Sequence, residues 1–210
     1  MIINFKKIPI FWYGGIKPNR KKNLLNTFKR LNISANFVQP YISDSIRIGC
    51  SLSHLKVLQI IKDYDEPVMV VEDDIKESEW YNEEIEIPDD TDAFYSGTCL
   101  NGIHKNWKNM GPDGGCCGNP IVLENYKNYY RIHGMLTTHS IIYVSKLYKK
   151  NCYDLLQENN GNRYLDVLFA SEMYKYKIYA PKYPLFYQNC EYDNYDAYIK
   201  TKTPLIKLLK

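Results

Sequence analysis

One short segment constrains the fold of this chain more than any other. Residues 68–71 (Val-Met-Val-Val) form a continuous apolar run, and residues 72–74 (Glu-Asp-Asp) follow it directly. An apolar run without alternation is typical of a strand that is buried on both faces. Such a strand lies in a sheet that helices cover on both sides, so the segment predicts an α/β fold.

The residues before this run alternate between strand-like and helix-like patterns. Residues 8–15 and 35–42 are predicted as short strands, the first of which closes on a Gly-Gly turn. Residues 17–33 and 51–67 carry apolar residues at helical spacing, with Ser51 or Ser53 as candidate N-cap of the second helix. This alternation predicts a largely parallel sheet. Later strands are expected at 93–98, 140–145 and 177–189, and later helices at 146–158 and 164–176.

Length and composition narrow the class of protein. The 210 residues fit one medium-sized domain, and 45% hydrophobic and 24% charged residues are typical of a soluble globular protein. No apolar run approaches the roughly 20 residues that span a bilayer, and the N-terminus lacks the pattern of a signal peptide. We therefore expect a single domain over 1–210, no membrane span and a cytoplasmic location. The six cysteines form no CxxC zinc pattern and are expected to be free thiols.

Charge is distributed unevenly along the chain. Residues 1–62 carry eleven Lys and Arg and one acid, whereas residues 63–92 carry fourteen Asp and Glu and one Lys. The first segment could meet phosphates and the second could hold a cation. The simpler interpretation is two solvated faces that attract each other.

The three carboxylates at 72–74 predict a cation site. Ligands of open α/β sheets bind beyond the carboxyl ends of the strands, which is where these acids are expected. Two carboxylates about 4 Å apart repel by roughly 4 kcal/mol at an effective dielectric near 20. Mn²⁺ or Mg²⁺ would offset this, because such ions take one or two protein carboxylates and leave positions for phosphates. The alternative is solvated surface charge, with at most one functional acid.

A longer stretch resembles a known family. Residues 49–75, GCSLSHLKVLQIIKDYDEPVMVVEDDI, resemble the signature of glycosyltransferase family 25, the lipopolysaccharide and collagen galactosyltransferase group. That family carries Gly-Cys-x-x-Ser-His-Leu, a helix, an apolar strand and Glu-Asp-Asp. Looser matches are DAFYSGT, HSIIYVSK and YLDVLF, so the resemblance spans roughly residues 8–190. FWYGGIKPNRKK departs from the family's Asn-Leu-Asp-Arg-Arg after the first strand. The composition is also similar to glycosyltransferase domains encoded by large DNA viruses of algae.

The resemblance implies a fold and an activity. The fold is the single-domain nucleotide-sugar transferase fold (GT-A type), a mixed, mostly parallel sheet flanked by helices. The activity is metal-dependent transfer of a hexose from a UDP-sugar to a glycan or glycoprotein hydroxyl, with inversion. Asp74 would bind the metal with support from Glu72, and Asp73 would contact the ribose or the donor sugar. Ser53 and His54 match the family's motif and are candidate donor contacts; His54 could equally be a packed helix residue.

Further candidate residues follow from their positions. Inverting transfer needs a base, and Asp166 matches the family's late Asp; it could instead be a helix N-terminal acid, and Glu172 and Asp154 are weaker substitutes. His139 is a candidate second metal ligand or donor contact. We expect three residues that follow the first strand to lie near the nucleotide: Tyr13, Gly14 and Arg20. Arg20 could pair with a phosphate or could simply be solvated.

Two other functions compete with glycosyl transfer. A metal-dependent nuclease would use Asp74-Ile75-Lys76 as an Asp-x-Lys end and the basic residues 1–62 as a nucleic-acid face. A nucleotide- or glycan-binding module would bind without turnover. We expect no nucleic-acid partner, and we expect the glycine-rich segment 109–120 to be a mobile loop near the site.

Overall fold

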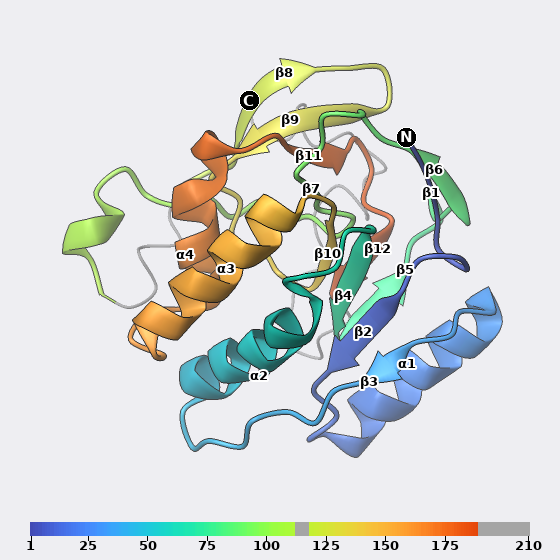
Figure 1. Ribbon diagram of the computed structural model, residues 1–210, viewed down its shortest axis with the longest axis horizontal. Coiled ribbons are helices and arrows are strands. Elements are labelled where there is room, and N and C mark those ends of the chain that lie inside the picture. The colour runs from blue at the N-terminus through green and yellow to red at the C-terminus, as the bar shows by residue number, and fades with distance from the viewer. Residues whose placement is uncertain (112–117, 189–210) are drawn as a thin grey trace.

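The computed structural model describes residues 1–111 and 118–188, and a mixed sheet of eight strands forms their centre (Figure 1). Residues 112–117 of the predicted glycine-rich loop, including Cys116 and Cys117, lie outside the described residues. Along the chain the elements are β1 (Ile2–Asn4), β2 (Ile10–Tyr13), α1 (Pro18–Leu31), β3 (Asn36–Phe37), α2 (Ile46–Ile61), β4 (Val68–Glu72), β5 (Ile75–Glu77), β6 (Glu84–Glu86), β7 (Ala93–Phe94), η1 (Trp107–Asn109), β8 (Ile121–Asn125), β9 (Tyr129–His133), β10 (Ser140–Tyr143), α3 (Lys146–Asn159), α4 (Leu165–Glu172), η2 (Met173–Lys175), β11 (Ile178–Pro181) and β12 (Phe186–Gln188).

The order of the central sheet is β3-β2-β4-β10-β7-β11-β9-β8. The pairings β2–β3, β2–β4 and β7–β11 are parallel, and β10 and β9 run antiparallel to their neighbours. Strands β3, β2, β4, β7, β11 and β8 therefore point one way, and only β10 and β9 point the other way. This confirms the predicted α/β fold with a mixed, mostly parallel sheet and flanking helices.

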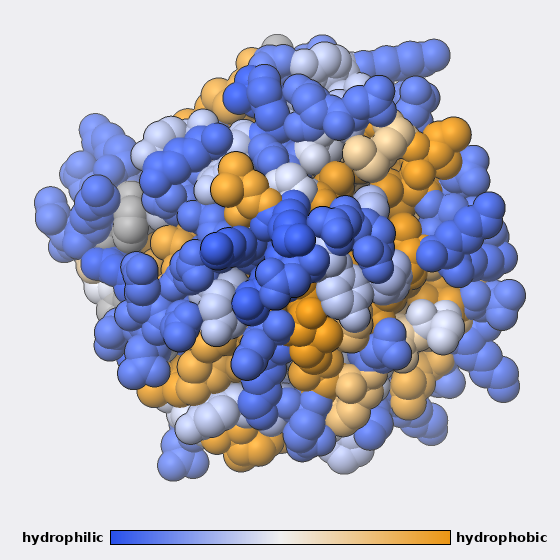
Figure 2. Space-filling view, viewed as in Figure 1, coloured by the Kyte–Doolittle hydropathy of each residue, from blue (hydrophilic) through white to orange (hydrophobic). Residues whose placement is uncertain are grey.

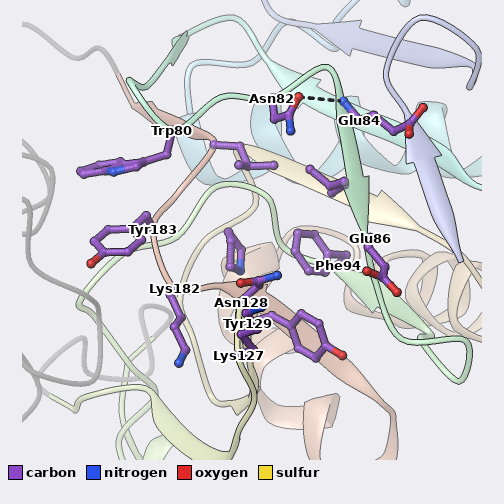
Figure 3. A pocket seen from close by; sticks show the side chains of 13 residues that line it. Trp80, Asn82, Glu84, Glu86, Phe94, Lys127, Asn128, Tyr129, Lys182 and Tyr183 are labelled. Atoms are coloured by element: carbon purple, nitrogen blue, oxygen red, sulfur yellow. Dashed lines mark hydrogen bonds between the residues drawn. The ribbon is translucent and has the colours of Figure 1, made fainter.

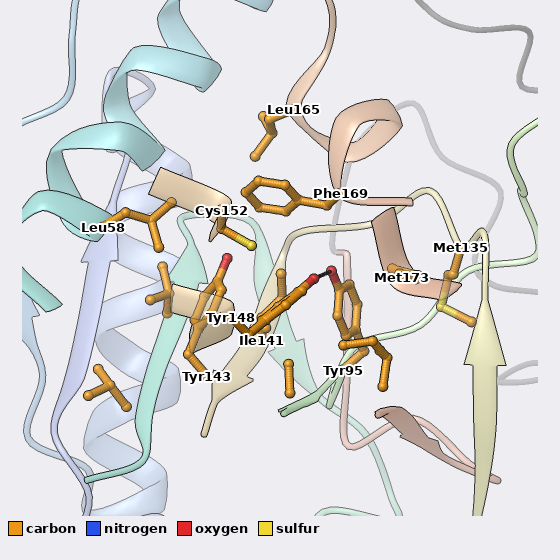
Figure 4. Packing of buried hydrophobic residues seen from close by; sticks show 14 of the residues in the cluster. Leu58, Tyr95, Met135, Ile141, Tyr143, Tyr148, Cys152, Leu165, Phe169 and Met173 are labelled. Atoms are coloured by element: carbon orange, nitrogen blue, oxygen red, sulfur yellow. Dashed lines mark hydrogen bonds between the residues drawn. The ribbon is translucent and has the colours of Figure 1, made fainter. Parts of the chain in front are cut away.

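Both faces of the sheet are covered, as the uninterrupted apolar run of β4 predicts. One face packs against α2, α3 and α4, where Tyr143, Tyr148 and Phe169 are buried and the hydroxyls of Tyr95 and Tyr148 lie 3.1 Å apart (Figure 4). The other face packs against α1 and the two-stranded ribbon of β1 and β6. The alternate residues of β4 divide between these two cores, and the strand is fully buried except at Glu72.

Helix α2 begins five residues earlier than the sequence predicts. Its N-cap is Ser45, whose side chain accepts a hydrogen bond from the Ile48 backbone N–H, so neither Ser51 nor Ser53 is the cap. Both serines are buried inside the helix. The prediction failed because residues 46–50 include Gly49, a weak helix former, which tertiary packing nevertheless keeps helical.

Several short strands were not predicted. Strand β5 follows Asp74 and pairs antiparallel with β12, so the segment that leaves the acids is fastened to the far end of the described chain. The β8–β9 hairpin closes one side of the sheet, and its register shifts between Val122 and Glu124. Strands of two to five residues carry too few alternating positions to stand out in the sequence.

Polar and charged side chains predominate on the face seen in Figure 2, and apolar residues appear there in separate groups. Among the described residues, none of the helices combines the length and the hydrophobicity that crossing a bilayer requires. Cys50, Cys99 and Cys152, the cysteines in the described part of the chain, are free thiols.

Candidate functional site

Strands β2 and β4 end side by side, and the acids lie at that edge. Strand β2 pairs in parallel with both β3 and β4, with Tyr13 opposite Glu72 in the register. The chain leaves β2 through α1 on one face of the sheet and returns to β4 through α2 on the other. The edge where β2 and β4 end is therefore a topological switch point, the place where open α/β sheets bind their ligands.

The turn between β2 and α1 is built around Asp73. Gly14 and Gly15 have φ angles of +110° and +81°, which residues with a side chain rarely adopt. The Gly15 backbone N–H donates to Asp73 Oδ2, and a Cβ at Gly14 would lie 2.5 Å from Asp73 Cγ. The close approach explains why glycine follows the first strand. It also holds the Asp73 carboxylate at the N-terminal side of α1, where the helix dipole favours negative charge.

Arg20 supplies a cation to the acidic edge. Its Nη1 lies 3.3 Å from Asp74 Oδ2 and 3.6 Å from Asp73 Oδ1. The side chain is on the first turns of α1, immediately after the Gly-Gly turn, so the local fold positions it. The sequence predicts that the acids need a positive partner, and Arg20 is such a partner for Asp73 and Asp74. Arg20 pairs with carboxylates in this structure, and its pairing with a phosphate remains a prediction.

Glu72 joins a chain of hydrogen bonds that runs into the core. Its Oε1 accepts from Thr138 Oγ1 at 2.7 Å and from the Tyr13 hydroxyl at 3.1 Å. The Tyr13 oxygen is 2.9 Å from His54 Nδ1, and His54 Nε2 is 2.8 Å from the Tyr143 hydroxyl. Because Tyr13 donates to Glu72, a neutral His54 ring donates from Nδ1 and accepts from Tyr143 at Nε2.

Burial and charge shift the titration of this network. Burial, together with the nearby charges of Asp74 and Asp73, raises the pKa of Glu72 to about 8, although its hydrogen bonds oppose the shift. Burial lowers the pKa of His54 to about 3, so the ring is neutral at physiological pH. The edge therefore holds carboxylates whose joint ionisation is unfavourable without a nearby cation.

Asp166, the candidate general base, is partly buried. It occupies the first turn of α4, its Oδ1 accepts from the Val167 backbone N–H at 2.8 Å, and burial raises its pKa. The negative charges of Asp166 and of residues 72–74 all act on the Cys50 thiol, whose pKa burial and these charges raise to about 12. Phe169, one turn after Asp166, packs edge-on against His54 with ring centroids 5.5 Å apart.

Two predicted donor contacts have structural partners instead. The Ser53 hydroxyl donates to the Gly49 carbonyl at 2.6 Å and accepts from the Tyr41 backbone N–H at 2.8 Å, which fastens the loop before α2. His139 is buried beside Gly97, and its Nδ1 is 2.5 Å from the Thr137 hydroxyl. Burial lowers the pKa of His139 to about 4. A contact between these residues and a donor remains a prediction.

The acids suit a cation that is shared with a ligand rather than one enclosed by protein. Within residues 1–111 and 118–188, no set of three or more His, Cys, Asp and Glu side chains is arranged to hold a metal ion. Mg²⁺ and Mn²⁺ sites that use substrate phosphates need only one or two protein carboxylates. The raised pKa of Glu72 shows that the edge would accept further positive charge. Asp74 with Glu72 therefore fits a divalent cation completed by phosphate and water.

Sequence analysis missed three members of this site. Thr138 contacts Glu72, Tyr143 contacts His54, and Cys50 lies within reach of the acids and Asp166. The antiparallel pairing of β10 with β4 brings the start of β10 to the end of β4, and a prediction of parallel strands places those residues at opposite edges. The consecutive hydroxyl residues Thr137 and Thr138 directly before a predicted strand are the only signal that the sequence offered.

No model of a known protein family matches the sequence, and no curated protein matches it. Solved structures with a similar chain path include a glycosyltransferase involved in the glycosylation of the major capsid of PBCV-1, with 10% identity, 93% of this chain and 97% of that chain covered, and a TM-score of 0.47. CTP:phosphocholine cytidylyltransferase from Streptococcus pneumoniae has 10% identity, coverage of 97% and 78%, and a TM-score of 0.43. UDP-glucose pyrophosphorylase has 8% identity, coverage of 84% and 73%, and a TM-score of 0.41. Similarity at this level concerns the chain path alone and assigns no activity to this protein.

Proposed function

We propose that the chain is a single-domain, metal-dependent glycosyltransferase that moves a hexose from a UDP-sugar to a hydroxyl of a glycan or glycoprotein, with inversion. The observation that carries the proposal is the group of three carboxylates at the switch point between β2 and β4, beside a Gly-Gly turn and Arg20. The resemblance of residues 49–75 to glycosyltransferase family 25 supports the same reaction. On this proposal the enzyme acts in the cytoplasm, that of the host if the gene is viral.

The donor binds at the edge where β2 and β4 end. The glycine turn holds Asp73 at this edge, and Tyr13 and Asp73 border the ribose. Asp74 and Glu72 would hold the divalent cation, Mn²⁺ or Mg²⁺, which would supply positive charge to the departing UDP. Arg20, which lies beside Asp74, would pair with the diphosphate.

Asp166 acts as the general base. It accepts the proton of the acceptor hydroxyl while that oxygen attacks the anomeric carbon from the side opposite UDP. Its raised pKa suits the role, because a carboxylate with a higher pKa is a stronger base. The hydrogen bond from the Val167 backbone N–H fixes one of its oxygens and leaves the other for the hydroxyl.

Calorimetry with UDP and Mn²⁺ tests the proposal. Asp74→Ala and Asp74→Asn should both abolish Mn²⁺-dependent UDP binding, because the cation loses its principal protein ligand. The matched control is Asp65→Ala, which removes a carboxylate that is 88% exposed and paired with Lys146 at the surface. Unchanged UDP affinity in the Asp74 variants would contradict the assigned role.

Two outcomes would favour the competing functions. Mn²⁺-dependent cleavage of plasmid DNA that Asp74→Asn abolishes would favour a nuclease. UDP binding without release of UDP from any UDP-sugar, even by slow hydrolysis, would favour a binding module. A thermal-shift screen of UDP, GDP, CMP and their sugars, with and without Mn²⁺, would identify the nucleotide.

A further inference from the structure

A cavity of about 330 Å³ lies on the sheet face that carries the β1–β6 ribbon, at the start of β9 and beside residues 181–185 (Figure 3). Its volume is at the lower end of the roughly 300–1,000 Å³ that is usual for small-ligand sites. None of the candidate residues at the β2–β4 edge lines it. The cavity is therefore separate from the proposed donor site.

The aromatic wall of the cavity is held rigidly. The rings of Trp80 and Tyr183 are stacked, with centroids 4.8 Å apart and planes 25° apart. Ser78 joins the two segments that carry them, because its hydroxyl donates to the Pro184 carbonyl at 2.5 Å and its backbone N–H donates to the Leu185 carbonyl at 2.9 Å. The Ser78 oxygen also accepts from the Trp80 backbone N–H at 3.1 Å. A wall fixed in this way loses little entropy when a ligand binds.

The polar lining suits a neutral, hydroxyl-rich ligand. Asn82 and Asn128 contribute exposed amides, each able to donate and to accept hydrogen bonds (Figure 3). The ionic lining residues balance, with two carboxylates and two ammonium groups: Glu84, Glu86, Lys127 and Lys182. A site without net charge gives no electrostatic preference to a nucleotide diphosphate or to a cation. The combination of a flat apolar wall with paired donors and acceptors matches a sugar ring, which has an apolar C–H face and a hydroxyl edge.

The chain path limits how far the cavity can lie from the acids. Trp80 follows Asp74 by six residues, so their Cα atoms are at most about 20 Å apart even if the chain is fully extended. Strand β5 occupies the first part of this segment and is paired with β12, which keeps the path fixed. A short oligosaccharide can span this distance.

From these observations we propose that the cavity is a subsite for a neutral sugar ring of the acceptor glycan, with Trp80 in its aromatic wall. This inference rests on the proposed function, because the term acceptor presupposes glycosyl transfer, and it narrows the substrate class of that reaction. The C–H groups of the sugar ring pack against the Trp80–Tyr183 pair, while the amides of Asn82 and Asn128 bind its hydroxyls. The acceptor is thereby a neutral oligosaccharide or its glycoprotein form, anchored away from the reacting hydroxyl.

The experiment measures glycan binding without a donor. The wild-type protein is applied to an array of neutral glycans. Its affinity for each glycan that binds it on the array is then measured by calorimetry. Trp80→Ala should weaken that binding at least tenfold. Tyr174→Ala is the matched control, since it removes an exposed aromatic ring from η2 and should leave binding unchanged. If Trp80→Ala does not fold, Trp80→Phe should retain part of the affinity and Asn82→Ala should weaken it at least threefold.

The results separate this inference from the proposed function. Asp74→Asn should keep wild-type glycan affinity, because the cavity does not contain Asp74. In a transfer assay, Trp80→Ala should raise the KM for the acceptor at least tenfold without changing hydrolysis of the donor. The subsite would be overturned if the wild type and Trp80→Ala bound glycans equally. It would also be overturned if the wild-type protein bound UDP but bound none of the neutral glycans. Glycan binding that depends on Trp80 with no turnover of any UDP-sugar would instead overturn only the proposed reaction.

Discussion

At the scale of single residues, the acidic edge is a balance of three carboxylates against one guanidinium. Arg20 lies within ion-pair distance of Asp73 and Asp74, and Glu72 accepts hydrogen bonds from the hydroxyls of Tyr13 and Thr138. Hydroxyls stabilise a carboxylate less than a cation does. Burial and the charges of Asp74 and Asp73 outweigh these hydrogen bonds and raise the pKa of Glu72 to about 8. A bound cation would favour the ionised form of Glu72.

Asp166→Asn separates a catalytic role from a structural one. The amide oxygen of Asn can still accept from the Val167 N–H but cannot take a proton, so transfer should fall by roughly 10²-fold or more while UDP binding persists. The folded-state pKa of Asp166 is raised, so its ionised form is disfavoured by folding at neutral pH. The Asn variant should therefore unfold at a urea concentration at or above that of the wild type. Glu158→Gln is the control. Near-wild-type transfer would assign the base elsewhere, and a marked loss of stability would indicate a structural residue.

At the scale of elements, helix α2 connects the edge to the core. His54 extends from its middle toward Tyr13 on β2 and Tyr143 on β10, and Ser53 fastens the loop that precedes it. Helix α2 therefore sets the position of the Tyr13 hydroxyl that donates to Glu72. Its N-terminal turns, with Gly49 and Cys50, continue to the region between the acids and Asp166.

Two serine substitutions test where α2 begins. Ser45→Ala should lower the free energy of unfolding by about 0.5–2 kcal/mol, because the Ile48 N–H loses its cap. The cap distance of 3.5 Å places the expectation at the lower end. Ser51→Ala should leave stability unchanged or raise it, since the buried Ser51 hydroxyl has no hydrogen-bond partner. Urea titration measures the free energy of unfolding of both variants. A larger loss for Ser51→Ala than for Ser45→Ala would indicate that Ser51, as the sequence predicted, is the N-cap.

The elements also show what sequence patterns can specify. The run at 68–71 correctly predicted a doubly buried strand. Of the apolar residues at helical spacing in α1, Leu24 and Phe28 are buried, whereas Leu25 is 44% exposed. The direction of β10 was not predictable, because an apolar strand has the same residue pattern in parallel and antiparallel sheets. Thr138 therefore stayed hidden as a partner of Glu72. The site depends on pairing between distant strands, which local periodicity does not encode.

At the scale of the whole molecule, the basic and acidic segments of the chain attract each other. Ion pairs join Lys6 to Glu83, Arg20 to Asp74, and Arg30 to Glu77, each time linking residues 1–62 with residues 63–92. This supports the simpler interpretation of the charge asymmetry, in which most of these residues serve the fold. Only the pairs at the β2–β4 edge lie where a ligand would bind.

Acidification should destabilise the fold through His54. Its folded pKa is about 3 against about 6.5 when unfolded, so between these values the unfolded chain binds a proton that the folded protein does not. The contribution is complete above about pH 6.5 and is lost as the pH falls below it. The Gln side chain of His54→Gln binds no such proton. The free energy of unfolding of this variant, which is lower than that of the wild type, should therefore approach the wild-type value by about 1.4 kcal/mol per pH unit from about pH 6 to 4.5. Urea titrations of both proteins at each pH measure this, and a constant difference would show that His54 does not titrate in this way.

The shifted register of the β8–β9 hairpin has a consequence for behaviour in concentrated solution. Among the described residues, strand β8 is the last strand of the sheet on that side, and Ile121 and Leu123 are about half exposed on it. A straight apolar border strand would invite a strand from another molecule to add to the sheet and seed aggregates. The irregularity between Val122 and Glu124 bends the strand and disturbs the row of backbone donors and acceptors that such an addition requires. We therefore expect the irregular pairing to disfavour self-association through this side of the sheet.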